Sequence, residues 1–202
     1  MLQREPVEPG TLSLIHSLQE QDYLQSFILV GGTALALQLG HRTSTDIDLF
    51  TNMRFDVPDL VTSLQLDYAI EIKQQMRHAL LCSIENIKTD FVFQASTMIE
   101  HIVHDENIRM ASLKEIAAMK IGAIASRGKK RDFVDLYCLL NHYTLVEMLE
   151  AFQNKYQGAT PELAIRSLFY FEDAENDQDP KCFFDYNWKT VKEKIKSEAA
   201  KL

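Results

Sequence analysis

The chain has 202 residues, of which 46% are hydrophobic, and a formal net charge of −8. This length suits one domain with an extension or two small lobes, and the acidic balance argues against a protein that coats nucleic acid broadly. No apolar stretch is long enough to span a membrane, and the first residues lack the apolar core of a signal peptide. We therefore expect a cytoplasmic protein without membrane association, whose three cysteines are inert thiols.

Residues 12–25 have the spacing of an amphipathic helix, and the apolar run 27–30 predicts a buried strand. That strand ends in Gly31-Gly32-Thr33. Glycines allow a tight turn and let backbone N–H groups approach an anion. A helix beginning at about Thr33 would point the positive end of its dipole at the same place, and the Thr33 hydroxyl would cap this helix or bind a phosphate oxygen.

The next predicted strand carries Asp46 and Asp48, which share one face, whereas Ile47 and Leu49 point into the core. Two carboxylates at this spacing can bind one hard cation such as Mg²⁺. Taken separately, the glycine turn is more often a simple helix cap and Asp-x-Asp more often a solvated face. Their occurrence in one strand–helix–strand unit favours the binding of a nucleoside triphosphate with its metal.

A helix, a strand and a β-hairpin follow, and they complete a mixed sheet. Their ranges are 57–66, 68–76 and, for the two hairpin strands, 79–85 and 87–93. In the last of these strands, Lys88 and Asp90 fall on one face.

From residue 113 the pattern is helical. The predicted helices span 113–127, 132–141, 144–156, 161–170 and 188–200. Ser112 and Glu115 form a capping-box signature before the first helix, Gly128 would end it, and Asp132 would cap the second. The acidic stretch before the last helix is expected to be a solvated loop.

Lys120 lies on the apolar stripe of the first of these helices, and Arg127 lies two turns further along nearly the same stripe. An ammonium on such a stripe is costly unless it meets a negative group. Both cations are candidates for binding substrate phosphate. The alternative is an aliphatic stem that carries its charged end out to water.

Two groups of residues resemble a known family. The first resembles the first motif of the DNA polymerase β-type nucleotidyltransferase superfamily and, more closely, its AbiEii/AbiGii toxin-like branch. It comprises Gly31, Gly32, Thr33, Ala34, Leu35, Arg42, Ser44, Asp46, Ile47, Asp48, Leu49 and Phe50. The second, from Lys120 through Arg127 and Arg131 to Asp132, Asp135 and Leu136, resembles later motifs of the same branch. The resemblance covers about residues 12–191.

The resemblance agrees with an α+β fold, in which a small mixed β-sheet nucleotidyltransferase lobe (1–110) precedes an α-helical lobe (111–202). It implies a metal-dependent enzyme that transfers a nucleotide from a nucleoside triphosphate to an RNA or protein acceptor. The implied cofactor is Mg²⁺ or Mn²⁺. The implied partners are an antitoxin protein and a tRNA acceptor end.

The resemblance also implies roles for individual residues. Asp46, Asp48 and Asp90 would be catalytic and hold the metal, with Asp90 as third carboxylate or general base; otherwise Asp90 is an exposed strand residue that pairs with Lys88 or Arg77. Asp132 would be catalytic or would orient a catalytic group, unless it belongs to an ion-pair lattice between two helices. The nucleotide would be bound by Gly31, Gly32, Thr33, Arg42, Ser44, Lys120 and Arg127.

Two other functions fit the same residues less well. One is a catalytically silent module with this fold that binds a nucleotide or a partner protein. The other is a phosphodiesterase or kinase that uses the same metal site.

Overall fold

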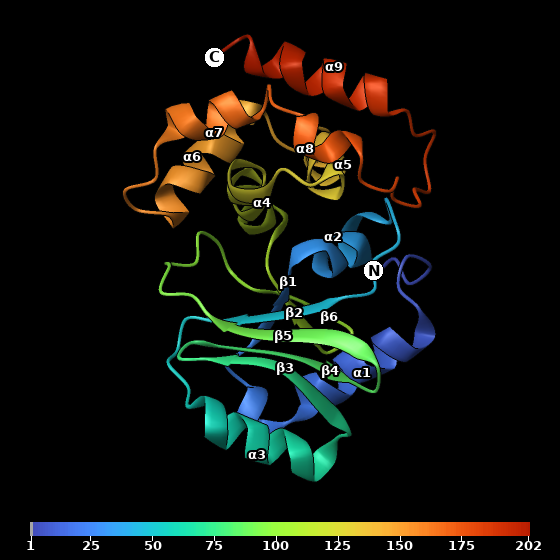
Figure 1. Ribbon diagram of the computed structural model, residues 1–202, viewed down its shortest axis with the longest axis vertical. Coiled ribbons are helices and arrows are strands. Elements are labelled where there is room, and N and C mark those ends of the chain that lie inside the picture. The colour runs from blue at the N-terminus through green and yellow to red at the C-terminus, as the bar shows by residue number, and fades with distance from the viewer. Residues whose placement is uncertain (1) are drawn as a thin grey trace. The chain divides into compact units, whose positions relative to one another are not determined.

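The computed structural model describes residues 2–202, and the chain divides into two compact units (Figure 1). The first unit contains the residues up to Gly40 together with Ser44–Ser96 and Ile102–Ala111. The second contains His41–Thr43, Thr97–His101 and Ser112–Leu202. The predicted lobes, 1–110 and 111–202, differ from these units chiefly because two short early segments group with the second unit.

The first unit is built around a mixed sheet with the strand order β3-β4-β5-β2-β1-β7-β6. Figure 1 shows α3 lying along one face of this sheet, with α1 on the same side. The unit's elements are α1 (Pro9–Glu20), a short 3₁₀ helix (Asp22–Leu24), β1 (Ile28–Val30), α2 (Gly31–Leu39), β2 (Ile47–Thr51), α3 (Val57–Asp67), β3 (Ile70–Met76), β4 (Ala79–Ile84), β5 (Ile87–Phe93), β6 (Val103–Asp105) and β7 (Ile108–Met110). The predicted α+β class with a mixed sheet is confirmed.

Side-chain alternation in β2 follows the predicted pattern. Ile47 and Leu49 are buried, whereas Asp48 and Phe50 on the opposite face are partly exposed. The core face is therefore fixed by the aliphatic residues, which leaves the other face of the strand to the aspartates.

Two hairpins of the sheet, β4–β5 and β6–β7, turn through a Glu-Asn pair with positive φ. Glu85 and Asn86 join β4 to β5, and Glu106 and Asn107 join β6 to β7. Two-residue turns of this conformation match the twist of the flanking strands. The first hairpin was predicted from the sequence, but the second was not, because strands of three residues show too little alternation.

The second unit is helical. Within it α4 packs against α5, α6 and α7, and α5 packs against α8 and α9. These helices are α4 (Leu113–Arg127), α5 (Lys130–Leu139), α6 (Leu145–Lys155), α7 (Pro161–Ser167), α8 (Glu172–Glu175) and α9 (Trp188–Ala199). All the predicted helices are present. The short α8 lies in the acidic stretch that was expected to be a solvated loop.

That acidic stretch is held in place by Lys130, which is buried. Its ammonium donates to the backbone carbonyl of Asp177 at 2.7 Å and to the carboxylate of Asp179 at 3.0 Å. It also lies 5.4 Å from the centre of the Trp188 ring. Most acidic side chains of the stretch are exposed, as expected. The stretch is nevertheless not a plain loop, because it contains α8 and Lys130 binds its carbonyl and carboxylate oxygens.

The two ends of α4 follow the predicted capping only in part. The Ser112 hydroxyl accepts a hydrogen bond from the Glu115 backbone N–H, and Gly128 ends the helix with φ +52°. The Glu115 carboxylate does not close a capping box. It accepts hydrogen bonds from the backbone N–H of Ile99 and from the ammonium of Lys155, both within the second unit.

None of the helices in residues 2–202 combines the length and apolar character that a bilayer crossing requires. The cysteines are free thiols. Burial raises the pKa of Cys82 and Cys138 to about 12, so both are protonated near neutral pH, as expected for inert thiols.

Removing one partner of the buried Glu115–Lys155 pair tests how much this ion pair contributes to the stability of the fold. Lys155→Met should lower the free energy of unfolding by about 3–5 kcal/mol, because it leaves a buried carboxylate without its cation. The side chains of Lys155 and Glu115 are only 3% and 1% exposed. The measurement is urea unfolding followed by circular dichroism.

Lys194→Met is the matched control, because Lys194 pairs with Glu198 at 2.9 Å on the exposed face of α9. It should change stability by less than about 0.5 kcal/mol. If the two substitutions changed the free energy of unfolding equally, the buried pair would contribute no more to stability than the exposed pair.

Candidate active site

The three predicted metal ligands come from two neighbouring strands. β2 and β5 are parallel, and their register sets Asp48 directly opposite Asp90. Asp46 immediately precedes β2, and Lys88 precedes Asp90 by two residues on β5. Because side chains alternate between faces, the sheet brings Asp46, Asp48, Lys88 and Asp90 together as one group, which we call the carboxylate patch.

A lysine lies among these carboxylates. The Lys88 ammonium is 2.8 Å from Asp90 Oδ2 and 3.7 Å from Asp46 Oδ2. Burial lowers the pKa of Lys88, but Asp90, Asp48 and Asp46 together outweigh it and hold the pKa above its usual value. Lys88 is therefore charged, and the pairing of Asp90 with Lys88 that the sequence offered as an alternative is present.

The carboxylate patch has the chemistry of a divalent-metal site but not a preformed cage. Within residues 2–202, no three His, Cys, Asp or Glu side chains are grouped so that they could hold an ion as they stand. Yet Asp90 Oδ1 is buried and has no hydrogen-bond partner, and an unsatisfied buried oxygen is costly. Carboxylate oxygens are the ligands that Mg²⁺ and Mn²⁺ prefer. The residues therefore fit such an ion, although Asp46 and Asp90 are arranged around an ammonium group.

The glycine turn lies against the same patch. α2 begins at Gly31, whose φ is +70°, and a Cβ atom there would lie 2.5 Å from Asp48 Oδ2. The position needs glycine twice, for its backbone conformation and for the space that Asp48 occupies. The N-terminus of α2, with backbone N–H groups that lack helical partners, thus begins beside a carboxylate of the patch.

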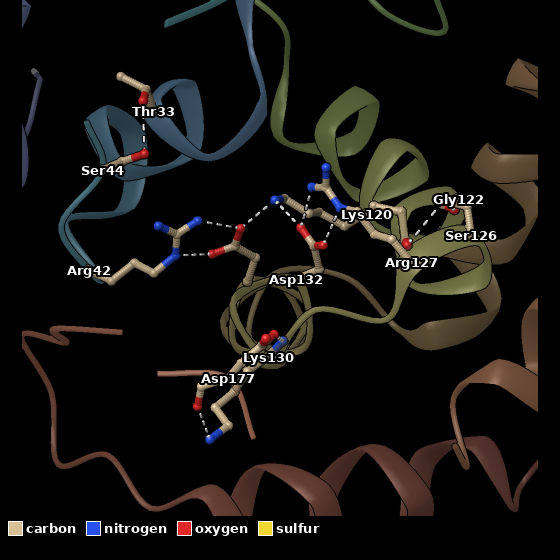
Figure 2. Close-up of polar contacts among 12 residues, drawn as sticks. Thr33, Arg42, Ser44, Lys120, Gly122, Ser126, Arg127, Lys130, Asp132 and Asp177 are labelled. Carbon is tan, nitrogen blue, oxygen red and sulfur yellow. Dashed lines mark hydrogen bonds and ion pairs between the residues drawn. The ribbon is translucent and has the colours of Figure 1, made fainter. Parts of the chain in front are cut away.

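Thr33 does not cap α2. The helix has Val30 as its N-cap residue and no side-chain capping bond. The buried Thr33 hydroxyl instead lies 2.8 Å from the Ser44 hydroxyl (Figure 2) and donates to the backbone carbonyl of Asp46. The capping prediction was wrong because the helix starts two residues earlier than expected, which places Thr33 inside its first turn.

In the second unit, Lys120 and Arg127 converge on Asp132 (Figure 2). The Lys120 ammonium is 2.9 Å from Asp132 Oδ1 and 2.5 Å from Asp135 Oδ2. The Arg127 guanidinium donates to both oxygens of Asp132, at 2.9 and 3.1 Å. Lys120 is 5% exposed, so its ammonium does not reach out to water. The ion-pair lattice between two helices that the sequence left open is present.

Asp132 does not cap α5 either. The helix begins at Lys130, with Lys129 as its N-cap residue and no side-chain capping bond. Asp132 is completely buried inside the first turn. Although burial raises its pKa, Lys120 and Arg127 hold the pKa below its usual value. The capping prediction failed because these two cations occupy both carboxylate oxygens.

The lattice continues through Asp135 to a segment far away in the chain. Arg42 donates to the two oxygens of Asp135 at 2.6 and 2.8 Å, and the His41 ring lies 2.8 Å from Oδ1. Arg42, which the resemblance assigned to the nucleotide, is 4% exposed, and its third nitrogen, Nη1, donates to the carbonyl of Thr43. The sequence analysis does not include His41 in this group, and it names Asp135 only among the residues that resemble the family's later motifs.

These contacts decide the ionisation of Asp135. Burial raises its pKa, but Arg42 and Lys120, with a hydrogen bond from His41, hold the pKa well below the usual value. Arg42, Lys120 and Arg127 pair with Asp132 and Asp135, so that three cations meet two carboxylates in these contacts. We call these five side chains the cationic lattice, and they carry one net positive charge.

A family model described as nucleotidyl transferase AbiEii toxin, type IV TA system, matches residues 13–201. The chain belongs to this family. The uncharacterized protein aq_aa25 of Aquifex aeolicus (strain VF5) is 34% identical over 157 residues, which are 75% of this chain and 76% of that protein. The predicted family is confirmed, and the chain belongs to the nucleotidyltransferase class of enzymes.

Two solved structures from Helicobacter pylori share the fold. One, named as a candidate nucleotidyltransferase, is 17% identical and has a TM-score of 0.58, over 96% of this chain and 94% of that chain. The other, JHP933, is 16% identical and has a TM-score of 0.53, over 96% of this chain and 92% of that chain. At these identities the likeness shows the fold of the AbiEii-family chain and no more.

The contact between Gly31 and Asp48 predicts the effect of a single methyl group. Gly31→Ala should lower stability by about 1–2 kcal/mol, because a residue with a Cβ atom is strained at positive φ. It should also reduce nucleotidyl transfer, because the methyl group displaces the Asp48 carboxylate. Urea unfolding and a transfer assay measure the two effects.

Gly10→Ala is the control, since nothing lies within 4 Å of a Cβ atom at Gly10 and its φ is ordinary. It should leave transfer unchanged and should not lower stability, because alanine is favoured over glycine inside a helix such as α1. A Gly31→Ala enzyme with full activity would contradict the close contact with Asp48.

The depressed pKa of Asp135 predicts how the stability of the protein changes with pH. Because its folded-state pKa is depressed, its stabilisation is present above the unfolded-state pKa of about 3.9 and disappears as the pH falls further. Asp135→Asn should destabilise the protein at pH 7 by about 3–5 kcal/mol, since it leaves buried cations unpaired. The gap between wild type and variant should narrow below about pH 4. Urea unfolding at a series of pH values measures it, and a constant gap would contradict the depressed pKa.

Proposed function

We propose that this nucleotidyltransferase transfers a nucleotide from a nucleoside triphosphate to an RNA or protein acceptor, and that Asp46, Asp48 and Asp90 hold its metal. The observation that carries the proposal is the parallel register that sets Asp48 opposite Asp90, with Gly31 against Asp48. The family description, which names a toxin of a type IV toxin–antitoxin system, supports an antitoxin protein as partner. A tRNA acceptor end and a cytoplasmic location stay predictions from the sequence.

The residues of the carboxylate patch have separate roles in this proposal. A bound Mg²⁺ or Mn²⁺ would neutralise phosphate charge and acidify the attacking hydroxyl. Asp90 would act as the third metal ligand or as the general base, because its Oδ1 has no hydrogen-bond partner and can bind a metal ion or accept a proton. The backbone N–H groups of Gly31 and Gly32, at the start of α2, would bind phosphate oxygens.

Thr33 and Ser44 have a positioning role in the proposal. Their hydroxyls contact each other, and Thr33 also holds the carbonyl of Asp46. These bonds fix the backbone from which the Asp46 carboxylate projects. Neither hydroxyl therefore needs to touch the nucleotide in order to matter for activity.

The cationic lattice of the second unit would act on the nucleotide through its excess charge. We propose that Lys120 and Arg127 contribute positive charge to the phosphates, and that Asp132 orients both cations. The Arg127 side chain is half exposed, whereas Asp132 is completely buried. A phosphate oxygen could therefore approach Arg127 while Asp132 keeps its guanidinium in place. Arg42 would act from a distance, by holding Asp135.

Label transfer tests the metal ligands. The purified protein is incubated with Mg²⁺, each labelled nucleoside triphosphate, and bulk tRNA or protein. Asp46→Asn and Asp48→Asn should each lower transfer by roughly 100-fold or more, as expected when an electrostatic group of an active site is lost. The readout is label on the acceptor together with released pyrophosphate.

Asp56→Asn is the control, because Asp56 is an exposed aspartate that caps α3 and asparagine caps equally well. Its transfer rate should equal that of the wild type. Transfer that survives both Asp46→Asn and Asp48→Asn would reject the proposed metal site.

A further inference from the structure

We propose that Lys88 is a displaceable counter-cation of the carboxylate patch, which competes with the divalent metal and so makes metal binding depend on the nucleotide. The proposal rests on the function proposed above and assigns a role to a residue that lies outside the predicted site. It concerns the first unit alone.

The geometry supports competition for the same oxygens. The Lys88 ammonium contacts Oδ2 of Asp90 at 2.8 Å and lies 3.7 Å from Oδ2 of Asp46. These carboxylates are two of the three proposed metal ligands. An ammonium and a divalent ion that bind the same carboxylates repel each other, because both are positive and lie only a few ångströms apart. The ammonium leaves Oδ1 of Asp90 without a partner, so it does not block the patch outright. Its repulsion lowers the affinity for a divalent ion and favours withdrawal of Lys88 when the ion binds.

The net charge of the carboxylate patch also supports competition between Lys88 and the metal. Three carboxylates and one ammonium give the patch a net charge of −2, against −3 without Lys88. A free divalent ion is thus attracted less strongly and meets the repulsion of the ammonium. Lys88 also offsets part of the mutual repulsion of the three carboxylates while the metal is absent.

Exposure makes Lys88 displaceable. Its side chain is 53% exposed, so the ammonium can return to water without leaving a cavity. Lys120, by contrast, is 6% exposed at its side chain and held by two aspartates. A triphosphate brings anionic oxygens that attract the freed ammonium and complete the shell of the ion, since Mg²⁺ is usually held by one or two carboxylates plus substrate phosphates. Metal and nucleotide should therefore bind together.

The experiment measures Mn²⁺ binding to the full chain by electron paramagnetic resonance of the free ion, without nucleotide. Lys88→Met should tighten Mn²⁺ binding by about three- to tenfold, as expected when one partly exposed unit charge a few ångströms from the ion is removed. Lys88→Arg, which keeps the charge, should bind like the wild type. Addition of a non-hydrolysable nucleoside triphosphate should reduce the difference between Lys88→Met and wild type.

Two further variants make the outcomes distinguishable. Lys73→Met is the matched control, because Lys73 is also 53% exposed and pairs with Glu71 on β3; its Mn²⁺ affinity should not change. Asp48→Asn should weaken Mn²⁺ binding. Urea unfolding of each variant establishes that it folds.

If Asp48→Asn weakens binding but Lys88→Met has no effect, the competition proposal is wrong and the metal site stands. If Lys73→Met tightens binding as much as Lys88→Met, the effect is general surface charge and the proposal is also wrong. The same holds if the nucleotide leaves the difference unchanged. If Asp48→Asn binds Mn²⁺ like the wild type, the ion does not use this patch, and both the competition and the proposed metal site are rejected.

Discussion

Parallel pairing of β2 with β5 sets Asp48 opposite Asp90, and the carboxylate patch depends on it. Side chains alternate along a strand, so a slip of one residue would turn Asp48 into the core and Ile47 out of it. The aliphatic residues prevent this, because Ile47, Leu49 and Phe91 are almost completely buried on the opposite face. The placement of the polar group is thus enforced by hydrophobic burial, which is stronger than any preference of the carboxylates themselves.

The charged groups of the two units differ in burial and in how completely they are paired. In the cationic lattice, Asp132 and Asp135 are completely buried and each of them is held by two or more cations. Such a network keeps one geometry, because the loss of any partner leaves an unpaired charge in the protein interior, which is costly. In the carboxylate patch, the cation is half exposed and one oxygen of Asp90 has no partner. The first arrangement suits a fixed framework, and the second suits a site that exchanges one cation for another.

Local patterns in the sequence predicted the elements well, and contacts between distant segments account for most of what was missed. The helices, the first hairpin and the aspartate face of β2 follow from periodicity and turn residues. The cationic lattice does not follow from such local patterns, since Arg42 binds Asp135 from 93 positions away in the chain. The missed hairpin did carry a signal: Glu106-Asn107-Ile108 repeats the sequence Glu85-Asn86-Ile87, and both Glu-Asn pairs adopt the same left-handed turn.

The misinterpretation of Thr33 shows how the first motif works. In sequence, Gly-Gly-Thr resembles an independent phosphate-binding turn. In the structure, Val30 pairs with Asp48 across β1 and β2, Gly31 leaves room for the Asp48 carboxylate, and Thr33 holds the backbone of Asp46. Successive residues thus position both aspartates from the neighbouring strand. The turn and the Asp-x-Asp segment therefore form one structural unit, in which the spacing of the carboxylates is set as much by the glycine turn as by β2 itself.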